Sequence, residues 1–351
     1  MADDAVQSGF AAGNQAPEAL LNTAVEVALG KAAGPISGAL IAFSPSHLPL
    51  PHTALQQLAA RLRCLQIRAG SFPGVISDQG SACAQAACAV LLFSPPLGLG
   101  AHGANTLLWA GPLPAEEGEL FAEQPAKLGA ISGKHAWFWQ YRERQTQLRT
   151  ALLGPLRHRQ LVSSGISPLT PLFPYVRQDG ALLLQLERYS ALPLLARSIP
   201  FALREARRLP LDRLLVGERD KDSRIRYLHI VATDTNRSGL WLERPLRADT
   251  QAYLAWRNPE TALRDTRTIL ESANNEWGIP SFAWISSSSG REAGFFPNAN
   301  SDLTLWQEYF PSCPLLGSFA LAEVSSRAAG TEIMRFSTVF DLFYRDDHQE
   351  N

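Results

Sequence analysis

The feature of this sequence that most restricts its fold is an order of segments that occurs near both ends of the chain. An apolar segment, a helical segment and a second apolar segment containing Gly-Ser-Phe follow one another in residues 38–72 and again in residues 280–319. A further apolar segment follows each copy, at 87–96 and at 334–344. The same order in two distant stretches indicates an internal duplication. We therefore expect two related halves, each contributing strands and a covering helix.

The spacing of apolar residues predicts both helices and strands throughout the chain. Helical spacing is clear in residues 51–63 and 259–278, whereas residues 225–246 read as two strands around a turn. Such a mixture predicts an α+β fold, with mixed or antiparallel sheets packed together and covered by helices. A chain of 351 residues exceeds the usual size of one hydrophobic core, so two domains are expected. Residues 1–16 are small and polar and are expected to form a disordered tail.

Composition excludes several classes of function. The chain carries 32 Lys and Arg against 33 Asp and Glu, so it lacks the basic excess typical of nucleic-acid-binding domains. No apolar run approaches the ~18 residues of a membrane-spanning helix, and the acidic start differs from a secretory signal. We therefore expect a cytoplasmic protein with neither nucleic-acid nor membrane partners. The four Cys and seven His residues show no metal-ligand spacing, and we expect no metal and no cofactor.

Two charged residues near the end of the chain are candidates for a binding site. Arg291 follows the serine-rich segment SSSSG, whose backbone N–H groups and guanidinium suit a carboxylate or phosphate. Glu323 lies between Ala322 and Val324 in an expected strand, where an unpaired buried carboxylate would be costly. We therefore predict that Glu323 faces water, a ligand or a partner, and Arg291 and Arg327 are the candidate partners.

The sequence resembles the FIST family, in its bacterial form with an N-terminal and a C-terminal FIST domain. The resemblance lies in FAWISSSSGREAGFF and RFSTVFDLFY near the end and in GSFPGVISDQG near the beginning. It covers about residues 36–345 and implies a FIST N-like domain over 30–187 and a FIST C-like domain over 188–346. The family is described as an intracellular sensory or signal-transduction module, proposed to bind small ligands such as amino acids.

The sequence departs from the family pattern at two cysteine positions and at one glycine position. Ser71 and Ser288 stand where the family has Cys, and Ala322 replaces Gly before Glu323. Binding of a ligand therefore fits this chain better than covalent chemistry, and we expect no catalytic residue. The ligand-binding residues that we predict are Ser71, Ser288, Gly290, Arg291, Gly317 and Glu323.

These observations leave three functions open. The first is a sensor for an amino acid or organic acid, with Arg291 on the carboxylate and Glu323 on the amine or orienting Arg291. A signalling protein is a further expected partner of such a sensor. The second is a serine-dependent hydrolase or transferase that uses Ser71 or Ser288. The third is a scaffold without a small ligand that binds a protein through exposed aromatic residues such as Trp137 and Trp139.

Overall fold

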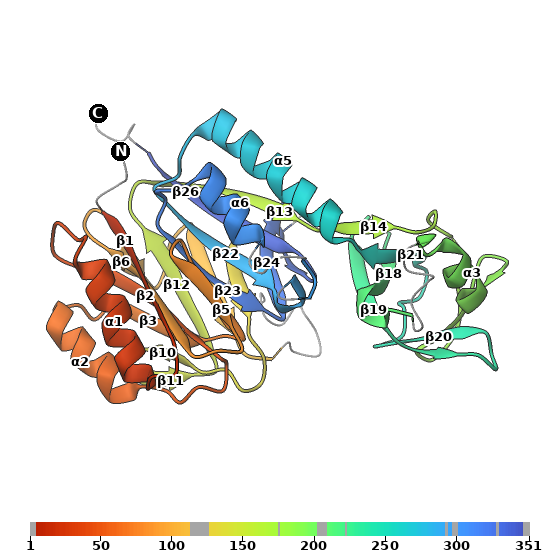
Figure 1. Ribbon diagram of the computed structural model, residues 1–351, viewed down its shortest axis with the longest axis horizontal. Helices are drawn as coiled ribbons and strands as arrows, with labels where there is room; N and C mark the ends of the chain where they lie inside the picture. Colours follow the sequence, from red (N-terminus) through yellow and green to blue (C-terminus); the bar gives the residue numbers. More distant parts are fainter. Residues whose placement is uncertain are drawn as a thin grey trace. The chain divides into compact units, whose positions relative to one another are not determined.

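The computed structural model (Figure 1) divides the chain into two compact units. The first combines Met1–Ser164 with Asp265–Asn351, and the second is Gly165–Arg264, inserted between these two parts. The expected boundary between residues 187 and 188 instead falls inside the inserted unit, because both related halves belong to the first unit. The structure describes the following residues: 5–112, 126–174, 176–201, 209–221, 223–291, 294–296, 301–327 and 330–346.

The first sheet of the larger unit has the order β1-β6-β2-β3-β10-β11. Strands β2 and β3 are parallel, and β6 is antiparallel to both β1 and β2. Helices α1 and α2 cover one face of this sheet, where leucines and alanines of both helices join one apolar core with β2 and β6 (Figure 1). The elements are β1 (Val6–Ala12), α1 (Pro17–Leu29), β2 (Gly38–Ser44), α2 (His52–Leu62), β3 (Ile67–Ser71), β6 (Ala87–Phe93), β10 (Phe138–Gln140) and β11 (Glu143–Gln145).

The second sheet has the order β13-β26-β22-β23-β4-β5. Strands β22 and β23 are parallel, and β26 is antiparallel to both β13 and β22. On one face, Trp306 of α6 stacks on Phe340 and Trp277 of α5 meets Tyr344 edge-on. The elements are β4 (Gly74–Ser77), β5 (Gly80–Cys83), β13 (Leu156–Ser163), α5 (Pro259–Trp277), β22 (Phe282–Ser288), η3 (Ser289–Arg291), α6 (Ser301–Tyr309), β23 (Leu315–Ala320) and β26 (Thr338–Arg345).

The two sheets share one plan, as expected of a duplication. The strands β1-β6-β2-β3 and β13-β26-β22-β23 lie in the same order with the same directions, and a helix connects the parallel pair in each. Ala39 pairs with Ile67 and Leu92, and Ala283 pairs with Leu315 and Leu342. β2 and β22 both have seven residues, so aligning their first residues, Gly38 and Phe282, makes Ala39 equivalent to Ala283. The strand pairings then define the equivalent positions in the rest of both repeats.

This register shows that the Gly-Ser-Phe triplets themselves are not equivalent. A Cβ on Gly70 would meet Trp109 and Phe138 in the core between the sheets. A side chain at position 317 would point to the opposite, helix-covered side, because the neighbouring Leu316 points into the core between the sheets and side chains alternate along a strand. Gly70 corresponds to Ser318, one residue further along. The evidence for the repeat is therefore the shared strand order and register, and not the Gly-Ser-Phe triplets.

A third sheet packs against both of the others. Its order is β25-β24-β9-β8-β12-β7. Buried side chains from all three sheets form one apolar core, which includes Phe93, Trp109 and Trp284. The elements are β7 (Gly98–Gly100), β8 (Asn105–Ala110), β9 (Leu128–Ile131), β12 (Gln147–Leu153), β24 (Ala322–Arg327) and β25 (Gly330–Met334). The structure thus confirms an α+β fold of packed mixed and antiparallel sheets covered by helices.

The inserted unit has its own sheet and core. Strands run in the order β14-β21-β18-β19-β20-β16-β15, with β17 paired to β16, and α3 contributes Leu194 and Leu195 to the core. The elements are β14 (Ile166–Pro168), β15 (Val176–Asp179), β16 (Leu182–Leu186), β17 (Tyr189–Ser190), α3 (Ala191–Ser198), η2 (Leu211–Arg213), β18 (Leu214–Arg219), β19 (Ile225–Asp234), β20 (Gly239–Leu242) and β21 (Gln251–Arg257).

Two expectations are wrong. Residues 1–16 include strand β1, whose seven residues pair with β6 from Val6 opposite Phe93 to Ala12 opposite Ala87, so this part of the expected tail is ordered. Trp137 and Trp139 are only 3% and 1% exposed, because both pack in the core beneath α1 and α2. They therefore offer no exposed surface to a protein partner.

Candidate functional site

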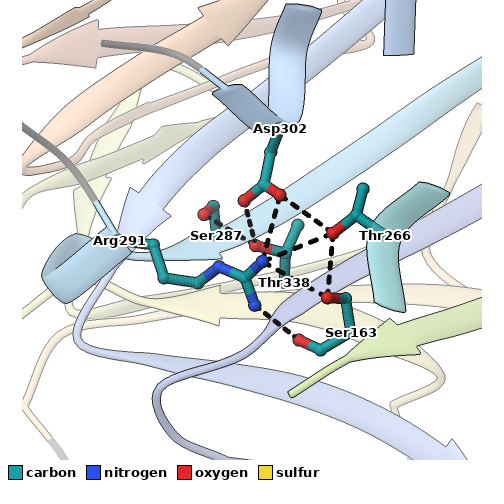
Figure 2. A network of polar contacts seen from close by, with 6 residues as sticks. All are labelled: Ser163, Thr266, Ser287, Arg291, Asp302 and Thr338. Atoms are coloured by element: carbon teal, nitrogen blue, oxygen red, sulfur yellow. Dashed lines mark hydrogen bonds and ion pairs between the residues drawn. The ribbon is translucent and has the colours of Figure 1, made fainter. Parts of the chain in front are cut away.

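Arg291 is a buried arginine immediately beyond the carboxyl end of β22. It is 2% exposed and lies in η3. Its Nη1 donates to the backbone oxygen of Ser163 at 2.7 Å, and its Nη2 forms an ion pair with Oδ1 of Asp302 at 3.0 Å (Figure 2). Asp302 lies in the first turn of α6, where the helix dipole also stabilises a negative charge. The guanidinium thus joins the ends of β13 and β22 to the start of α6.

Hydroxyl groups complete the network around Asp302. Thr266 of α5 contacts Oδ1 at 3.0 Å, and Thr338 of β26 donates to Oδ2 at 2.8 Å. Ser287 shares a hydrogen bond of 2.9 Å with Thr338 (Figure 2). Both carboxylate oxygens therefore have partners, which offsets the cost of burying the charge.

The first repeat shows that this fold can be built without the network. The equivalent pairs of positions are Ala11 and Ser163, Phe43 and Ser287, and Cys88 and Thr338. The three residues of the first repeat all belong to the apolar core beneath α1 and α2. The same strand positions are thus apolar in one repeat and hydrogen-bonded in the other, so the polar set is a property of the second repeat alone.

A small cavity adjoins the ion pair. Its volume is about 10 Å³, which is about the space of one water molecule. Two buried polar atoms of its lining residues, Nε of Arg291 and Oγ of Ser81, have no hydrogen-bond partner among the residues that the structure describes. The lining residues are Ile76, Ser81, Ser287, Arg291, Phe296, Ser301, Asp302, Leu303 and Phe319. The cavity therefore combines a charged pair and free hydrogen-bonding groups with an apolar wall.

Glu323 is also buried, but its carboxylate is not the ion-pair partner of Arg291. It is 0% exposed, and its Oε2 accepts a hydrogen bond of 2.7 Å from Ser337. Burial raises the pKa of Glu323 to about 8, although the bond from Ser337 and the charge of Arg291 act in the opposite direction. Glu323 does not line the cavity at Arg291. At this cavity Asp302, rather than Glu323, is therefore the carboxylate that pairs with Arg291.

The other predicted site residues lie in different surroundings. Ser288 and Gly290 lie in the same segment as Arg291, at the end of β22 and in η3. The N–H of Gly290 donates to Oγ of Ser288 at 3.3 Å. Ser71 is fully buried, and its hydroxyl donates to the oxygen of Ser46 and accepts from the N–H of Trp137. Gly317 packs so closely that an added Cβ would lie 2.4 Å from a backbone oxygen of β22. Ser71 and Gly317 thus serve packing in this structure.

Sequence reasoning missed most of the network. Asp302, Ser163, Thr266 and Thr338 were not singled out as site residues. One signal in the sequence could have revealed the network. Serine and threonine residues stand at the ends of apolar strands in the second repeat, where the equivalent residues of the first repeat are apolar. That signal requires the register of both repeats, which the structure supplies.

Comparison of this chain with models of known protein families and with curated proteins gives no match. The resemblance to the FIST family therefore stays a prediction. Among the residues that the structure describes, no group of His, Cys, Asp and Glu side chains has the arrangement of a metal site. Within the same residues, no helix combines the length and the apolar character needed to cross a membrane.

Proposed function

We propose that this protein is a sensor of a small carboxylate ligand, an amino acid or an organic acid, bound at the cavity of Arg291 and Asp302. The observation that supports the proposal is the buried polar network at the end of β22, which the first repeat replaces with apolar side chains. The carboxyl ends of parallel strands are common ligand sites in α/β sheets. A family-like role in signalling, in the cytoplasm and with a protein partner, belongs to the same proposal.

The residues around the cavity suit the two charges of an amino acid. Arg291 has an unpartnered Nε–H that can donate to a carboxylate, and Asp302 can accept from an ammonium group. Ile76, Leu303 and Phe319 offer an apolar wall to an aliphatic side chain. The amine thus falls to Asp302 in place of Glu323.

The size of the cavity implies that binding changes the network. A space for one water molecule cannot hold an amino acid, so the ligand must exchange with existing contacts of Arg291 or Asp302. These contacts connect different elements: Arg291 is bonded to Ser163 of β13 and to Asp302 of α6, and Asp302 is bonded to Thr266 of α5. A ligand that competes for them favours a second arrangement of these elements, which is what a sensor requires.

The proposal is tested by thermal denaturation of the purified protein with a panel of amino acids and organic acids. At a concentration 100 times its Kd, a ligand stabilises the native state by about 2.7 kcal/mol, enough to raise the melting temperature measurably. Arg291→Lys keeps the charge but loses the planar fork and should abolish the response. Arg68→Lys, a change at another buried arginine, should preserve it. A wild-type protein that responds to no member of the panel would disprove the proposal.

A further inference from the structure

Two buried side chains on the side of the second sheet that faces away from α5 and α6, and one on the third sheet, have polar atoms without a hydrogen-bond partner among the described residues. These are Oγ of Ser286, Oγ of Ser318 and Oε1 of Glu323. All three residues are 0% exposed. An unpartnered polar atom in the interior costs about 1–3 kcal/mol, and nearly all such atoms in native structures have a partner.

Ser286 and Ser318 are neighbours on this side. Trp284 and Leu316, two residues before them on β22 and β23, belong to the core shared by the three sheets. Because side chains alternate along a strand, Ser286 and Ser318 point towards the same core. They are register partners in the parallel pair, yet no hydrogen bond joins their hydroxyls. The two hydroxyls can therefore share a bridging molecule.

Glu323 points to the same core from the third sheet. It pairs with Ala130 of β9, which belongs to that core, and directly paired residues share a face. Its Oε2 accepts from Ser337, whose backbone oxygen accepts from the N–H of Ser288. The carboxyl is thus held beside the end of β22, on the side of Ser286.

The first repeat again provides an internal reference. Ala42 and Gly70 occupy the positions of Ser286 and Ser318, and neither carries a polar side chain. The fold therefore does not require hydroxyls at these positions. Two unpartnered hydroxyls that only the second repeat carries, together with an unpartnered carboxyl oxygen of the third sheet, indicate a bound partner.

We propose that Ser286, Ser318 and Glu323 form a buried site for a small hydrogen-bonding molecule of the size of water or ammonium, separate from the cavity at Arg291. Ammonium can donate hydrogen bonds to two serine oxygens and a carboxyl oxygen at once, whereas water can donate to two of these oxygens and accept a hydrogen bond from a serine hydroxyl. Water leaves the carboxyl neutral, in keeping with a pKa of about 8, whereas ammonium favours the carboxylate.

The test compares the melting temperature of wild-type protein with that of Ser286→Ala/Ser318→Ala, in NaCl and in NH₄Cl at equal ionic strength and pH. If the site is occupied, the double variant loses bonded hydroxyls and melts lower by roughly 2–4 °C for each. Ser132→Ala, which removes a buried hydroxyl bonded to the oxygen of Ser71, gives the reference size of such a loss. A double variant as stable as the wild type, or more stable, in both salts overturns the proposal.

The two salts distinguish the occupants. Ammonium predicts an additional stabilisation of the wild type in NH₄Cl that the double variant lacks, whereas water predicts the same difference between the proteins in both salts. If the double variant does not fold, a crystal structure of the wild type decides the question, provided that its resolution shows ordered water molecules. Electron density between the two serine hydroxyls supports the site, and its absence overturns it.

Discussion

Nη2 of Arg291 lies 3.0 Å from Oδ1 of Asp302, in an ion pair that connects the end of β22 to the start of α6. The two residues are 11 positions apart, and the guanidinium is also bonded to Ser163 at the end of β13. One buried pair therefore fixes the ends of three elements at the rim of the cavity. Its integrity matters both for the stability of this region and for the binding that we propose.

The first prediction concerns this pair. Arg291→Met leaves the Asp302 carboxylate buried without its ion-pair partner, and we expect a loss of about 3–5 kcal/mol in the free energy of unfolding. Asp302→Asn leaves Arg291 without its counter-charge and should also destabilise the protein. Because the residues interact directly, the double variant should lose less than the sum of the two single losses. Urea denaturation of the four proteins measures the coupling, and strictly additive losses would contradict the pairing.

The second prediction concerns the pH dependence caused by Glu323. Burial raises the pKa of Glu323 from its ordinary value of 4.5 to about 8. Between these values the native state holds a proton that the unfolded chain releases. The contribution of Glu323 to stability is therefore fully present below about pH 4.5 and falls as the pH rises to 8, by roughly 1.4 kcal/mol per pH unit.

Glu323→Gln isolates this effect, since the amide has nearly the shape of the carboxylic acid and does not titrate. The difference in unfolding free energy between Glu323→Gln and the wild type should grow from pH 5 to pH 8 in favour of the variant. Chemical denaturation at a series of pH values measures it. Parallel pH profiles for the two proteins would show that Glu323 has an ordinary pKa.

The third prediction concerns the hydroxyl of Thr338. Thr338→Val keeps the shape of the side chain but removes the donor to Oδ2 of Asp302 and the contact with Ser287. Loss of a bond to a charged group should cost about 1.5–3 kcal/mol. Thr23→Val, at an exposed hydroxyl that donates to the oxygen of Ala19, should cost much less. Equal losses in the two variants would be inconsistent with a charged, buried acceptor.

The fourth prediction concerns strand β1. Removal of residues 1–12 exposes the edge of β6 and takes the buried side chain of Val6 out of the core, so the shortened protein should melt far below the full chain or aggregate. Thermal denaturation followed by circular dichroism is the measurement. An unchanged melting temperature would mean that these residues are a dispensable tail, as their composition suggests.

The order of helices and strands could be predicted from the sequence because it depends on local periodicity. The segments around β2, α2, β22 and α6 show the expected pattern, and both repeats are folded as packed sheets with covering helices. β1 could not be predicted in this way, because VQSGFAA has few residues that favour strands and is ordered by its pairing with β6.

The candidate site could be predicted only in part. Arg291 and its serine-rich segment were found from their local sequence, but its partners Ser163 and Thr266 are 128 and 25 positions away. Only the register of β13 and β26 shows that Ser163 lies beside Thr338. Glu323 was identified as a carboxyl among apolar residues, but the sequence could not show that Asp302 lies nearer to Arg291. The partners of Arg291 and the position of Asp302 depend on side-chain direction and on pairing between residues far apart in the sequence, which local patterns do not reveal.

The central claim is tested most directly by titration calorimetry with the panel ligand that stabilises the protein most. Ser81→Ala is the informative variant. Ser81 lines the cavity, and its hydroxyl has no hydrogen-bond partner among the described residues, so its removal breaks no hydrogen bond of the described fold. We predict one binding event in the wild type, binding at least tenfold weaker in Ser81→Ala, and unchanged binding in the control Arg68→Lys. Equal affinity in the wild type and in Ser81→Ala would contradict a ligand site at Arg291 and Asp302.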